Sequence, residues 1–277
     1  MRRACVIGWP VEHSRSPLIH RYWLKHYGID GDYVKEAVRP EELARFLGSL
    51  GARGYAGANV TLPHKEAALR AAESADEAAM AIGAANTLWF DPDGTLHASN
   101  TDAYGFMTNL EAEAPDWNAG RRPVMLLGAG GAARAILHGL LAAGVSRILL
   151  ANRTRDRAED LAEAFGEAVE MVDWADRNRA LQGCGLLVNA TSLGMTGKEA
   201  LDVDLAALPN DAVVAEIVYS PLETDLLAAA RARGNRVVDG LGMLLHQAVP
   251  GFERWFGVRP EVTPELRAHV AASLGAT

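Results

Sequence analysis

Short apolar runs alternate with helical stretches along this chain, and the alternation stops once and then starts again. It opens with the apolar run 4–7 and the helical pattern 16–28, and it continues to a helical pattern that ends near residue 113. The segment 112–123 is polar and rich in small residues, and six more strand-like runs lie beyond it. Strands separated by helices are typical of parallel sheets in α/β proteins. Two such series in 277 residues predict two α/β domains.

The two series predict different sheets. The N-terminal domain, residues 1–113, is expected to hold a mixed sheet, because residues 86–100 read as two strands around an Asp-Pro-Asp-Gly turn. This antiparallel hairpin is expected at the edge of the sheet. The second domain, residues 121–240, is expected to be a Rossmann-type, doubly wound sheet. The segment 241–277 is helical and offers no further strand, so we expect it to pack back on the N-terminal domain.

Charge and composition restrict the class of partner. The chain has 27 basic and 35 acidic residues, a formal net charge of −8, which disfavours a nucleic-acid binder because such proteins present a basic face. The longest uncharged run, 180–197, is too polar to span a membrane, and the N-terminus has no signal-peptide core. Only two cysteines are present, too few for a disulfide framework. We therefore expect a cytoplasmic protein with a small-molecule partner, and neither nucleic acid nor membrane.

A glycine-rich loop of the pattern G-x-G-x-x-A follows the strand-like run 123–127 and opens a helix. Glycines allow a tight turn and close approach of the backbone, and the helix N-terminus offers free N–H groups to a pyrophosphate. A glycine turn that serves only packing remains the alternative. The loop residues predicted to bind a dinucleotide are Gly128, Ala129, Gly130, Gly131 and Ala132.

The end of the next strand indicates which dinucleotide binds. An NAD site usually has a carboxylate here for the ribose 2′-hydroxyl, but this strand ends in Asn152, Arg153 and Thr154, with Arg157 just beyond. A guanidinium can hold a 2′-phosphate with paired, charge-assisted hydrogen bonds. A solvated basic helix start is the alternative reading, although basic residues oppose the dipole at a helix N-terminus. These four residues therefore predict NADP(H).

Hydride chemistry needs a proton donor or acceptor, and the N-terminal domain offers Lys65 and Asp102. Taken singly, each has an ordinary structural explanation, since the lysine could be a solvated side chain and the aspartate a helix cap. The histidines show no metal-ligand spacing such as H-E-x-x-H, so we expect no metal.

Several blocks, in order over nearly the whole chain, together resemble the shikimate dehydrogenase family. Each block alone is a weak signal, but so many in sequence are not expected by chance. The blocks are Gly8–Pro17, Gly57–Glu66, Gly83–Thr87, Asn100–Gly105, Gly128–Ala133, Asn152–Thr154, Asn189–Ser192, Tyr219–Thr224 and Asp239–Gln247.

The resemblance implies reversible, NADPH-dependent reduction of 3-dehydroshikimate to shikimate in chorismate and aromatic amino acid biosynthesis, in a cleft between the two domains. It implies that Lys65 and Asp102 are the catalytic pair. Ser14 and Ser16 resemble the serines that bind the substrate carboxylate; Ser16 also suits the N-cap before Pro17, which favours Ser14 as the ligand. The resemblance further implies substrate contacts from Asn59, Thr61, Asn86, Tyr219 and Gln247, and cofactor contacts from Thr191, Ile217 and Gly240.

Two residues depart from the family pattern, and several alternatives stay open. Glu216 stands where aspartate is expected and Asp225 where proline is common. A quinate or quinate/shikimate dehydrogenase is the related alternative, and a non-catalytic dinucleotide-binding sensor is the alternative from another class. The sequence is compatible with a monomer and with a homodimer.

Overall fold

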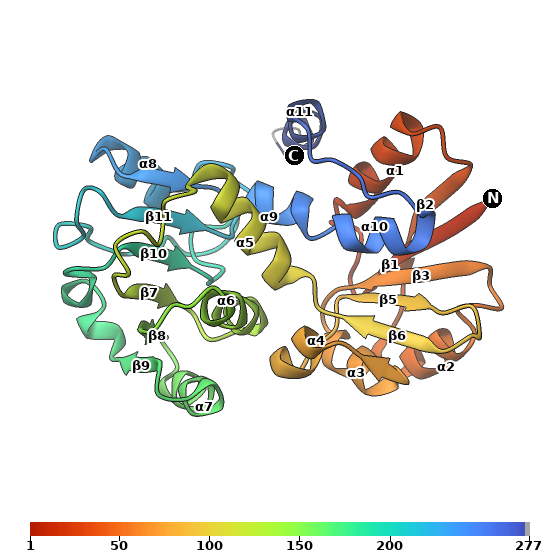
Figure 1. Ribbon diagram of the computed structural model, residues 1–277, viewed down its shortest axis with the longest axis horizontal. Helices are drawn as coiled ribbons and strands as arrows, with labels where there is room; N and C mark the ends of the chain where they lie inside the picture. The colour runs from red at the N-terminus through yellow and green to blue at the C-terminus, as the bar shows by residue number, and fades with distance from the viewer. Residues whose placement is uncertain (275–277) are drawn as a thin grey trace. The chain divides into compact units, whose positions relative to one another are not determined.

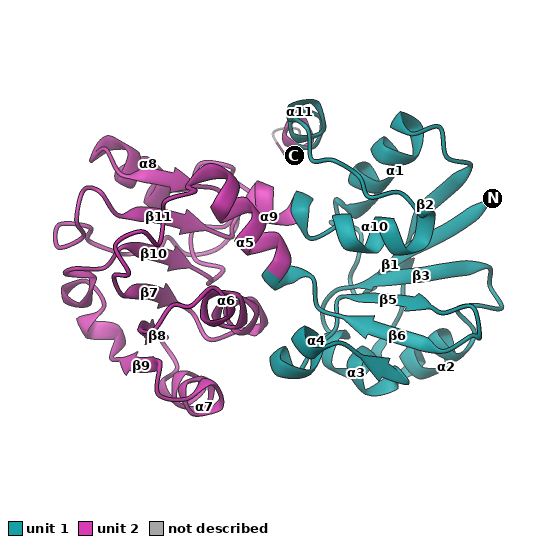
Figure 2. Ribbon diagram, viewed as in Figure 1, with its two compact units in different colours: residues 1–103, 245–270 teal, residues 104–244, 271–277 magenta. Residues whose placement is uncertain are grey.

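The computed structural model describes residues 1–274, which divide into two compact units (Figure 2). Unit 1 comprises Met1–Ala103 and Leu245–Val270, and unit 2 comprises Tyr104–Leu244 with the short segment from residue 271 onward. The division at residues 103 and 104 falls inside a helix, ahead of the polar segment 112–123. Residues 275–277 of the predicted C-terminal segment lie outside the described residues. No helix within residues 1–274 is long and apolar enough to cross a membrane.

Unit 1 contains a mixed six-stranded sheet in the order β2-β1-β3-β5-β6-β4 (Figure 1). β1 is parallel to β2 and β3, and β5 is antiparallel to both β3 and β6. The hairpin of β5 and β6 is confirmed, but its expected place at the edge is wrong, because the two-residue strand β4 pairs beyond β6. The strands are β1 (Arg2–Gly8), β2 (Gly31–Ala37), β3 (Tyr55–Val60), β4 (Ser74–Ala75), β5 (Thr87–Phe90) and β6 (Leu96–Ser99).

Helices cover both faces of this sheet. The alternate residues Cys5 and Ile7 of β1 join the apolar cluster with α2 and α3. On the other face the Trp255 indole of α10 donates to the Leu88 carbonyl oxygen at 2.8 Å. A Cβ on Gly57 would lie 2.2 Å from that indole nitrogen, so only glycine admits the helix. The helices are α1 (Ser16–His26), η1 (Pro40–Glu42), α2 (Leu43–Gly48), α3 (Lys65–Ala71), α4 (Glu77–Ile82), α10 (Val249–Phe256) and α11 (Pro264–Ala272).

Unit 2 contains a parallel six-stranded sheet in the order β12-β11-β10-β7-β8-β9. This is the doubly wound order of a Rossmann-type fold, with the change of direction at β7, so the predicted fold class is confirmed. Ligands of such sheets bind at the carboxyl ends of the strands beside this point. The strands are β7 (Val124–Leu127), β8 (Ile148–Ala151), β9 (Val169–Val172), β10 (Leu186–Asn189), β11 (Val213–Glu216) and β12 (Arg236–Val238).

Both faces of this second sheet are buried. Val124 and Leu126 of β7 pack on α5, α6 and α7, whereas Met125 and Leu127 pack in a second cluster with α8. The central strands β7 and β8 are apolar along their whole length, as is typical of parallel strands covered on both faces. The helices are α5 (Asp102–Glu113), α6 (Gly131–Ala142), α7 (Arg155–Phe165), η2 (Trp174–Asp176), η3 (Arg179–Leu181), α8 (Asp225–Ala232) and α9 (Gly240–His246).

Candidate functional site

Lys65 and Asp102, 37 residues apart in sequence, meet in unit 1. Lys65 is the first residue of α3 and Asp102 the first of α5, and the Lys65 Nζ lies 2.5 Å from the Asp102 Oδ2. Their side chains are 27% and 14% exposed, so the pair is open to a small molecule and still partly shielded from water. Asp102 is the first helical residue of α5, and its carboxylate accepts from Lys65 and from Asn86. The two residues therefore contact each other, which neither a solvated lysine nor a helix-capping aspartate would require.

Asn86 holds the other carboxylate oxygen of Asp102. Its Nδ2 donates to Asp102 Oδ1 at 2.8 Å, while its Oδ1 accepts from the Thr101 backbone N–H at 2.9 Å. Because a backbone N–H can only donate, the amide oxygen must face Thr101 and the amide nitrogen must face Asp102. Asn86 therefore orients the carboxylate that orients Lys65.

Ser14 and Ser16 lie together before α1. The Ser14 hydroxyl donates to the Ser16 Oγ at 3.2 Å and accepts from the Ser16 backbone N–H at 3.3 Å. The predicted N-cap role of Ser16 is wrong: α1 begins at Ser16 itself, Arg15 is the N-cap residue, and no side chain caps the helix. Since Ser14 already accepts the first N–H, the Ser16 hydroxyl is not committed to capping. Both hydroxyls are therefore candidates to bind an anion.

The remaining predicted substrate residues of unit 1 are placed less uniformly. Asn59 on β3 is 5% exposed, and its Nδ2 donates to the Asn86 carbonyl oxygen at 3.1 Å. Thr61 directly follows β3 and is half-buried. Gln247 lies in the turn between α9 and α10, where its carbonyl oxygen accepts from the Thr101 hydroxyl at 2.7 Å. Tyr219 belongs to unit 2, after β11.

Three residues that sequence reasoning missed join this network: Tyr33, Thr87 and Thr101. The two threonines each follow an asparagine, Asn86 and Asn100, and this repeated Asn-Thr pair is a signal that could have found them. Tyr33 carries no such signal, because an aromatic residue in a strand reads as core. Its hydroxyl nevertheless donates to Asn59 Oδ1 at 2.7 Å.

The glycine loop of unit 2 follows β7, at the change of direction in the sheet. Gly128 has φ +106°, and a Cβ there would lie 3.0 Å from the Ala190 backbone, so glycine is required on both grounds. Gly130 is the N-cap residue of the 12-residue helix α6 and makes no side-chain cap. Both Gly130 and Gly131 are exposed, and nothing lies within 4 Å of a Cβ built on either. The loop thus offers free N–H groups beside open space, which fits a pyrophosphate.

The strand end predicted to select NADP(H) lies beside this loop, because β8 pairs with β7 and the Gly128 N–H donates to the Ala151 carbonyl oxygen at 2.8 Å. Asn152 Nδ2 donates to the Thr154 carbonyl oxygen at 2.8 Å and orders the turn into α7. Arg153 is exposed and pairs with Glu199 at 2.7 Å, whereas Arg157 is exposed and forms no ion pair with the residues described.

Glu216 is a buried carboxylate at the end of β11, opposite Asn189 on β10. The Asn189 Nδ2 lies 3.0 and 2.9 Å from its two oxygens, and the Val218 N–H donates to Oε1 at 3.0 Å. Burial raises the pKa of Glu216 to about 7, against these hydrogen bonds. The Asn189 Oδ1 in turn accepts from the Thr191 hydroxyl at 2.7 Å.

Ile217 and Gly240 meet close to these strand ends. A Cβ on Gly240 would lie 2.3 Å from the Ile217 carbonyl oxygen, so glycine at the start of α9 permits this approach. The predicted cofactor residues Gly128, Asn152, Thr191 and Ile217 thus follow four neighbouring parallel strands and lie along one edge of the sheet.

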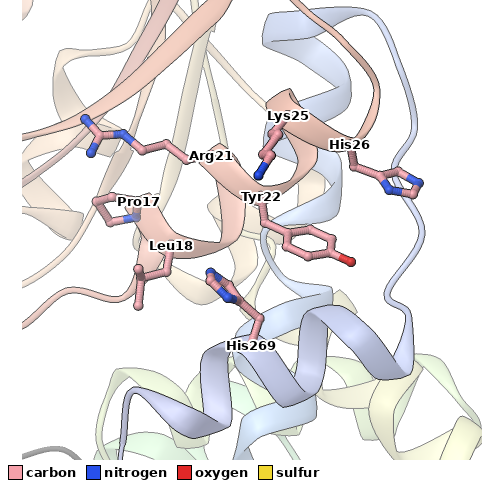
Figure 3. Close-up of a pocket in the computed structure, with 7 residues that line it drawn as sticks. All are labelled: Pro17, Leu18, Arg21, Tyr22, Lys25, His26 and His269. Carbon is pink, nitrogen blue, oxygen red and sulfur yellow. The ribbon is translucent and has the colours of Figure 1, made fainter.

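A separate hollow of about 550 Å³ lies in unit 1 between α1 and α11 (Figure 3). Tyr22 contacts the rings of His26 and His269 there, at 6.0 and 5.5 Å between centroids. The Arg21 guanidinium is already paired with Asp32 at 3.0 Å. None of the predicted site residues lines this hollow.

Three family models match the chain: the shikimate dehydrogenase substrate binding domain at residues 6–88, shikimate / quinate 5-dehydrogenase at 111–199, and the shikimate 5′-dehydrogenase C-terminal domain at 240–264. Among curated relatives, a shikimate dehydrogenase (NADP(+)) of Rhodopseudomonas palustris strain HaA2 is 60% identical over 274 residues, 99% of this chain and 96% of that protein. One from Paramagnetospirillum magneticum is 58% identical over 269 residues, 97% of this chain and 98% of the relative.

Solved structures give the same result at lower identity. Shikimate 5-dehydrogenase from Thermus thermophilus, in complex with NADP(H) and shikimate, has a TM-score of 0.85 at 36% identity and covers 99% of this chain and 100% of its own. Quinate dehydrogenase from Corynebacterium glutamicum, in complex with NAD, has a TM-score of 0.90 at 31% identity, with 98% and 99% coverage. The family models and the curated relatives together show that this chain belongs to the shikimate dehydrogenase family.

Proposed function

We propose that the chain catalyses the reversible, NADPH-dependent reduction of 3-dehydroshikimate to shikimate, a step of chorismate and aromatic amino acid biosynthesis. The observation that carries this proposal is the contact between Lys65 and Asp102, 2.5 Å between Nζ and Oδ2, in a partly exposed position beside Asn86. The NADP-dependent relatives at 58–60% identity support the choice of substrate and cofactor.

Unit 2 carries the residues we assign to the cofactor. The open N-terminus of α6 and the close approach at Gly128 suit a pyrophosphate, and Arg153 and Arg157 offer guanidinium groups for a 2′-phosphate. When bound, NADPH supplies the hydride that reduces the carbonyl carbon. We assign to the same ligand three residues that follow the ends of β10, β11 and β12, namely Thr191, Ile217 and Gly240.

Unit 1 carries the residues we assign to the substrate and to the proton. A carbonyl that accepts a hydride develops negative charge on its oxygen, which the Lys65 ammonium stabilises. Asp102 keeps the ammonium in place and can orient a ring hydroxyl. In the reduction that oxygen also takes up a proton, which the Lys65 ammonium can donate. In the reverse reaction the deprotonated pair accepts the hydroxyl proton as the hydride leaves the carbon.

We assign the carboxylate of the substrate to the hydroxyls of Ser14 and Ser16, which are neutral donors that suit an exchangeable anion. Thr61, Asn86 and Gln247 are assigned to the ring hydroxyls, where fixed polar groups reject a substrate that lacks one. Asn59 is assigned to the same set, although its Nδ2 is already bonded to the Asn86 carbonyl and to Thr87.

We propose that residues 1–113 bind the substrate, that residues 121–240 bind NADP(H), and that the C-terminal helices support the first domain. Residues 104–113 of α5 belong to compact unit 2. One chain carries both sets of residues, so the reaction requires no second copy, and a homodimer stays open. Cys5 and Cys184 are buried free thiols, which fits our proposal of a reducing cytoplasm.

A spectrophotometric assay with shikimate and quinate, each against NADP⁺ and NAD⁺, tests the proposal. We expect the highest kcat/KM with shikimate and NADP⁺. The highest kcat/KM with quinate would instead identify a quinate dehydrogenase. This alternative is tested because the quinate dehydrogenase of Corynebacterium glutamicum has a similar structure. Binding of dinucleotide without turnover in any of the four combinations would identify a non-catalytic sensor.

A further inference from the structure

A series of hydrogen bonds inside unit 1 joins the buried hydroxyl of Tyr33 to the catalytic pair. It passes only through side chains, those of residues on β2, β3 and β5 and of Asn86 directly before β5, and it ends on the carboxylate of Asp102. In order, Tyr33 Oη donates to Asn59 Oδ1 at 2.7 Å, Asn59 Nδ2 to Thr87 Oγ1 at 3.2 Å, Thr87 Oγ1 to Asn86 Oδ1 at 2.9 Å, and Asn86 Nδ2 to Asp102 Oδ1 at 2.8 Å.

Backbone groups fix the direction of every bond in this series. Asn59 Nδ2 also donates to the carbonyl oxygen of Asn86, which can only accept, so the Asn59 oxygen must face Tyr33. The Tyr33 hydroxyl must therefore donate. At the far end, the Thr101 N–H fixes the Asn86 amide in the same way. In every hydrogen bond of the series, the donor is therefore the residue nearer Tyr33 and the acceptor is the residue nearer Asp102.

The surroundings of Tyr33 keep its hydroxyl protonated, so that it can donate. It is 0% exposed, and burial raises the pKa of its phenol well above the usual 10, so the hydroxyl stays protonated. Its ring stacks on His20 with 4.0 Å between centroids, which holds the hydroxyl in place. Burial outweighs an interaction with the Ser16 side chain, which lowers the same pKa.

We propose that Tyr33 is a positioning residue for catalysis, which holds the Asn59 amide and thereby fixes Asn86 and Asp102 against Lys65. This inference rests on the proposed function and deepens it. Without the hydroxyl, the buried Asn59 oxygen loses its donor, and an unsatisfied buried acceptor favours rearrangement of the amides that follow. Small misplacement of a catalytic group lowers the rate strongly. The Ser14 and Ser16 hydroxyls, proposed to bind the carboxylate, both remain in a variant that lacks the Tyr33 hydroxyl.

The test is Tyr33→Phe, which keeps the ring and its stacking and removes the hydroxyl. We expect kcat for shikimate oxidation with NADP⁺ to fall about tenfold while KM for shikimate stays within about twofold. The matched control is Tyr55→Phe, because the Tyr55 hydroxyl in the same sheet bonds Glu36 and Arg3 outside the series. This control is expected to keep the wild-type kcat.

A double-mutant cycle separates positioning from general disturbance of the fold. In an Asn86→Ala background the series is already broken, so adding Tyr33→Phe is expected to lower kcat no further; losses that multiply would contradict the proposal. If Tyr33→Phe does not fold, Thr87→Val removes the next hydroxyl and carries the same expectation.

An unchanged kcat in either folded variant, or a rise in KM without loss of kcat, would overturn the role of Tyr33. Wild-type protein is assayed alongside. Failure of the wild type to oxidise shikimate would refute the proposed function itself and is thus distinct from failure of the variant.

Discussion

Ser14 is half-buried directly before α1, and its hydroxyl forms hydrogen bonds with Ser16. A carboxylate contact there is distant from the reacting carbonyl, so it stabilises the bound substrate and the transition state alike. We therefore expect Ser14→Ala to raise KM for shikimate about tenfold, the loss of roughly 1.5 kcal/mol for a hydrogen bond to a charged group, with little change in kcat. Steady-state kinetics at saturating NADP⁺ measure both constants. An unchanged KM would show that the carboxylate binds elsewhere.

Arg153 carries the prediction on cofactor choice. Its guanidinium pairs with Glu199 across an exposed surface, and such pairs contribute little, so a 2′-phosphate can replace the glutamate. Arg153→Ala is expected to lower kcat/KM with NADP⁺ about tenfold or more and to leave the value with NAD⁺ nearly unchanged. Arg147→Ala is the control, since that arginine pairs with Glu170 and precedes β8. Equal losses with both cofactors would assign Arg153 to the fold or the adenine.

At the scale of elements, Glu216 ties the end of β11 to the end of β10. Its folded pKa of about 7 lies above the ordinary value of 4.5, so the folded chain binds this proton more readily than the unfolded chain. Stability from this group is therefore present below pH 4.5 and is lost as the pH rises through 7, by roughly 3 kcal/mol in all.

Glu216→Gln cannot titrate, so its unfolding free energy is expected to fall less between pH 5 and pH 8 than that of the wild type. Urea unfolding at several pH values measures this difference in slope. Glu163→Gln, at an exposed position on α7, is the control and is expected to follow the wild type. Parallel curves for wild type and Glu216→Gln would contradict the raised pKa.

Most elements could be predicted from the sequence because each leaves a local pattern. The six runs of unit 2 are all strands, and the hairpin 86–100 is present. β4 could not be predicted, because a strand of two residues is too short to show an alternation of apolar and polar residues. The cap at Ser16 was mispredicted because Ser14, two residues earlier, accepts the N–H. The roles of Lys65 and Asp102 could be expected from the family resemblance. The hydrogen bonds from Tyr33 to Asn59 and from Asn86 to Asp102 could not, because they join residues 26 and 16 positions apart and no sequence period encodes such tertiary contacts.

At the scale of the whole molecule, the two units are expected to respond oppositely to acid. His20 in unit 1 is fully buried, neither ring nitrogen is hydrogen-bonded to a described residue, and burial lowers its pKa to about 3, with Asn59 opposing part of the shift. The unfolded chain binds this proton near pH 6.5, so stability is lost as the pH falls from 6.5 toward 3, by roughly 5 kcal/mol. Glu216 in unit 2 acts in the other direction over an overlapping range.

His20→Phe keeps the stack on Tyr33 and removes the titration. Its unfolding free energy is expected to fall less than that of the wild type between pH 7 and pH 5, whatever its absolute stability. His13→Phe at an exposed position is the matched control. A variant as acid-sensitive as the wild type would show that His20 does not govern the response of unit 1.

The proposed reaction requires both units, because the proposed catalytic pair lies in unit 1 and the proposed cofactor loop lies in unit 2. The central claim is that Lys65, held by Asp102, carries the proton chemistry. The most direct measurement is kcat of Lys65→Ala for shikimate oxidation with NADP⁺, beside Lys25→Ala at an exposed site on α1. We expect kcat of Lys65→Ala to fall about 10²-fold or more, while the variant still binds shikimate and NADPH. The kcat of the control is expected to stay at the wild-type value. A folded Lys65→Ala protein that turns over within about twofold of the wild type would contradict the account.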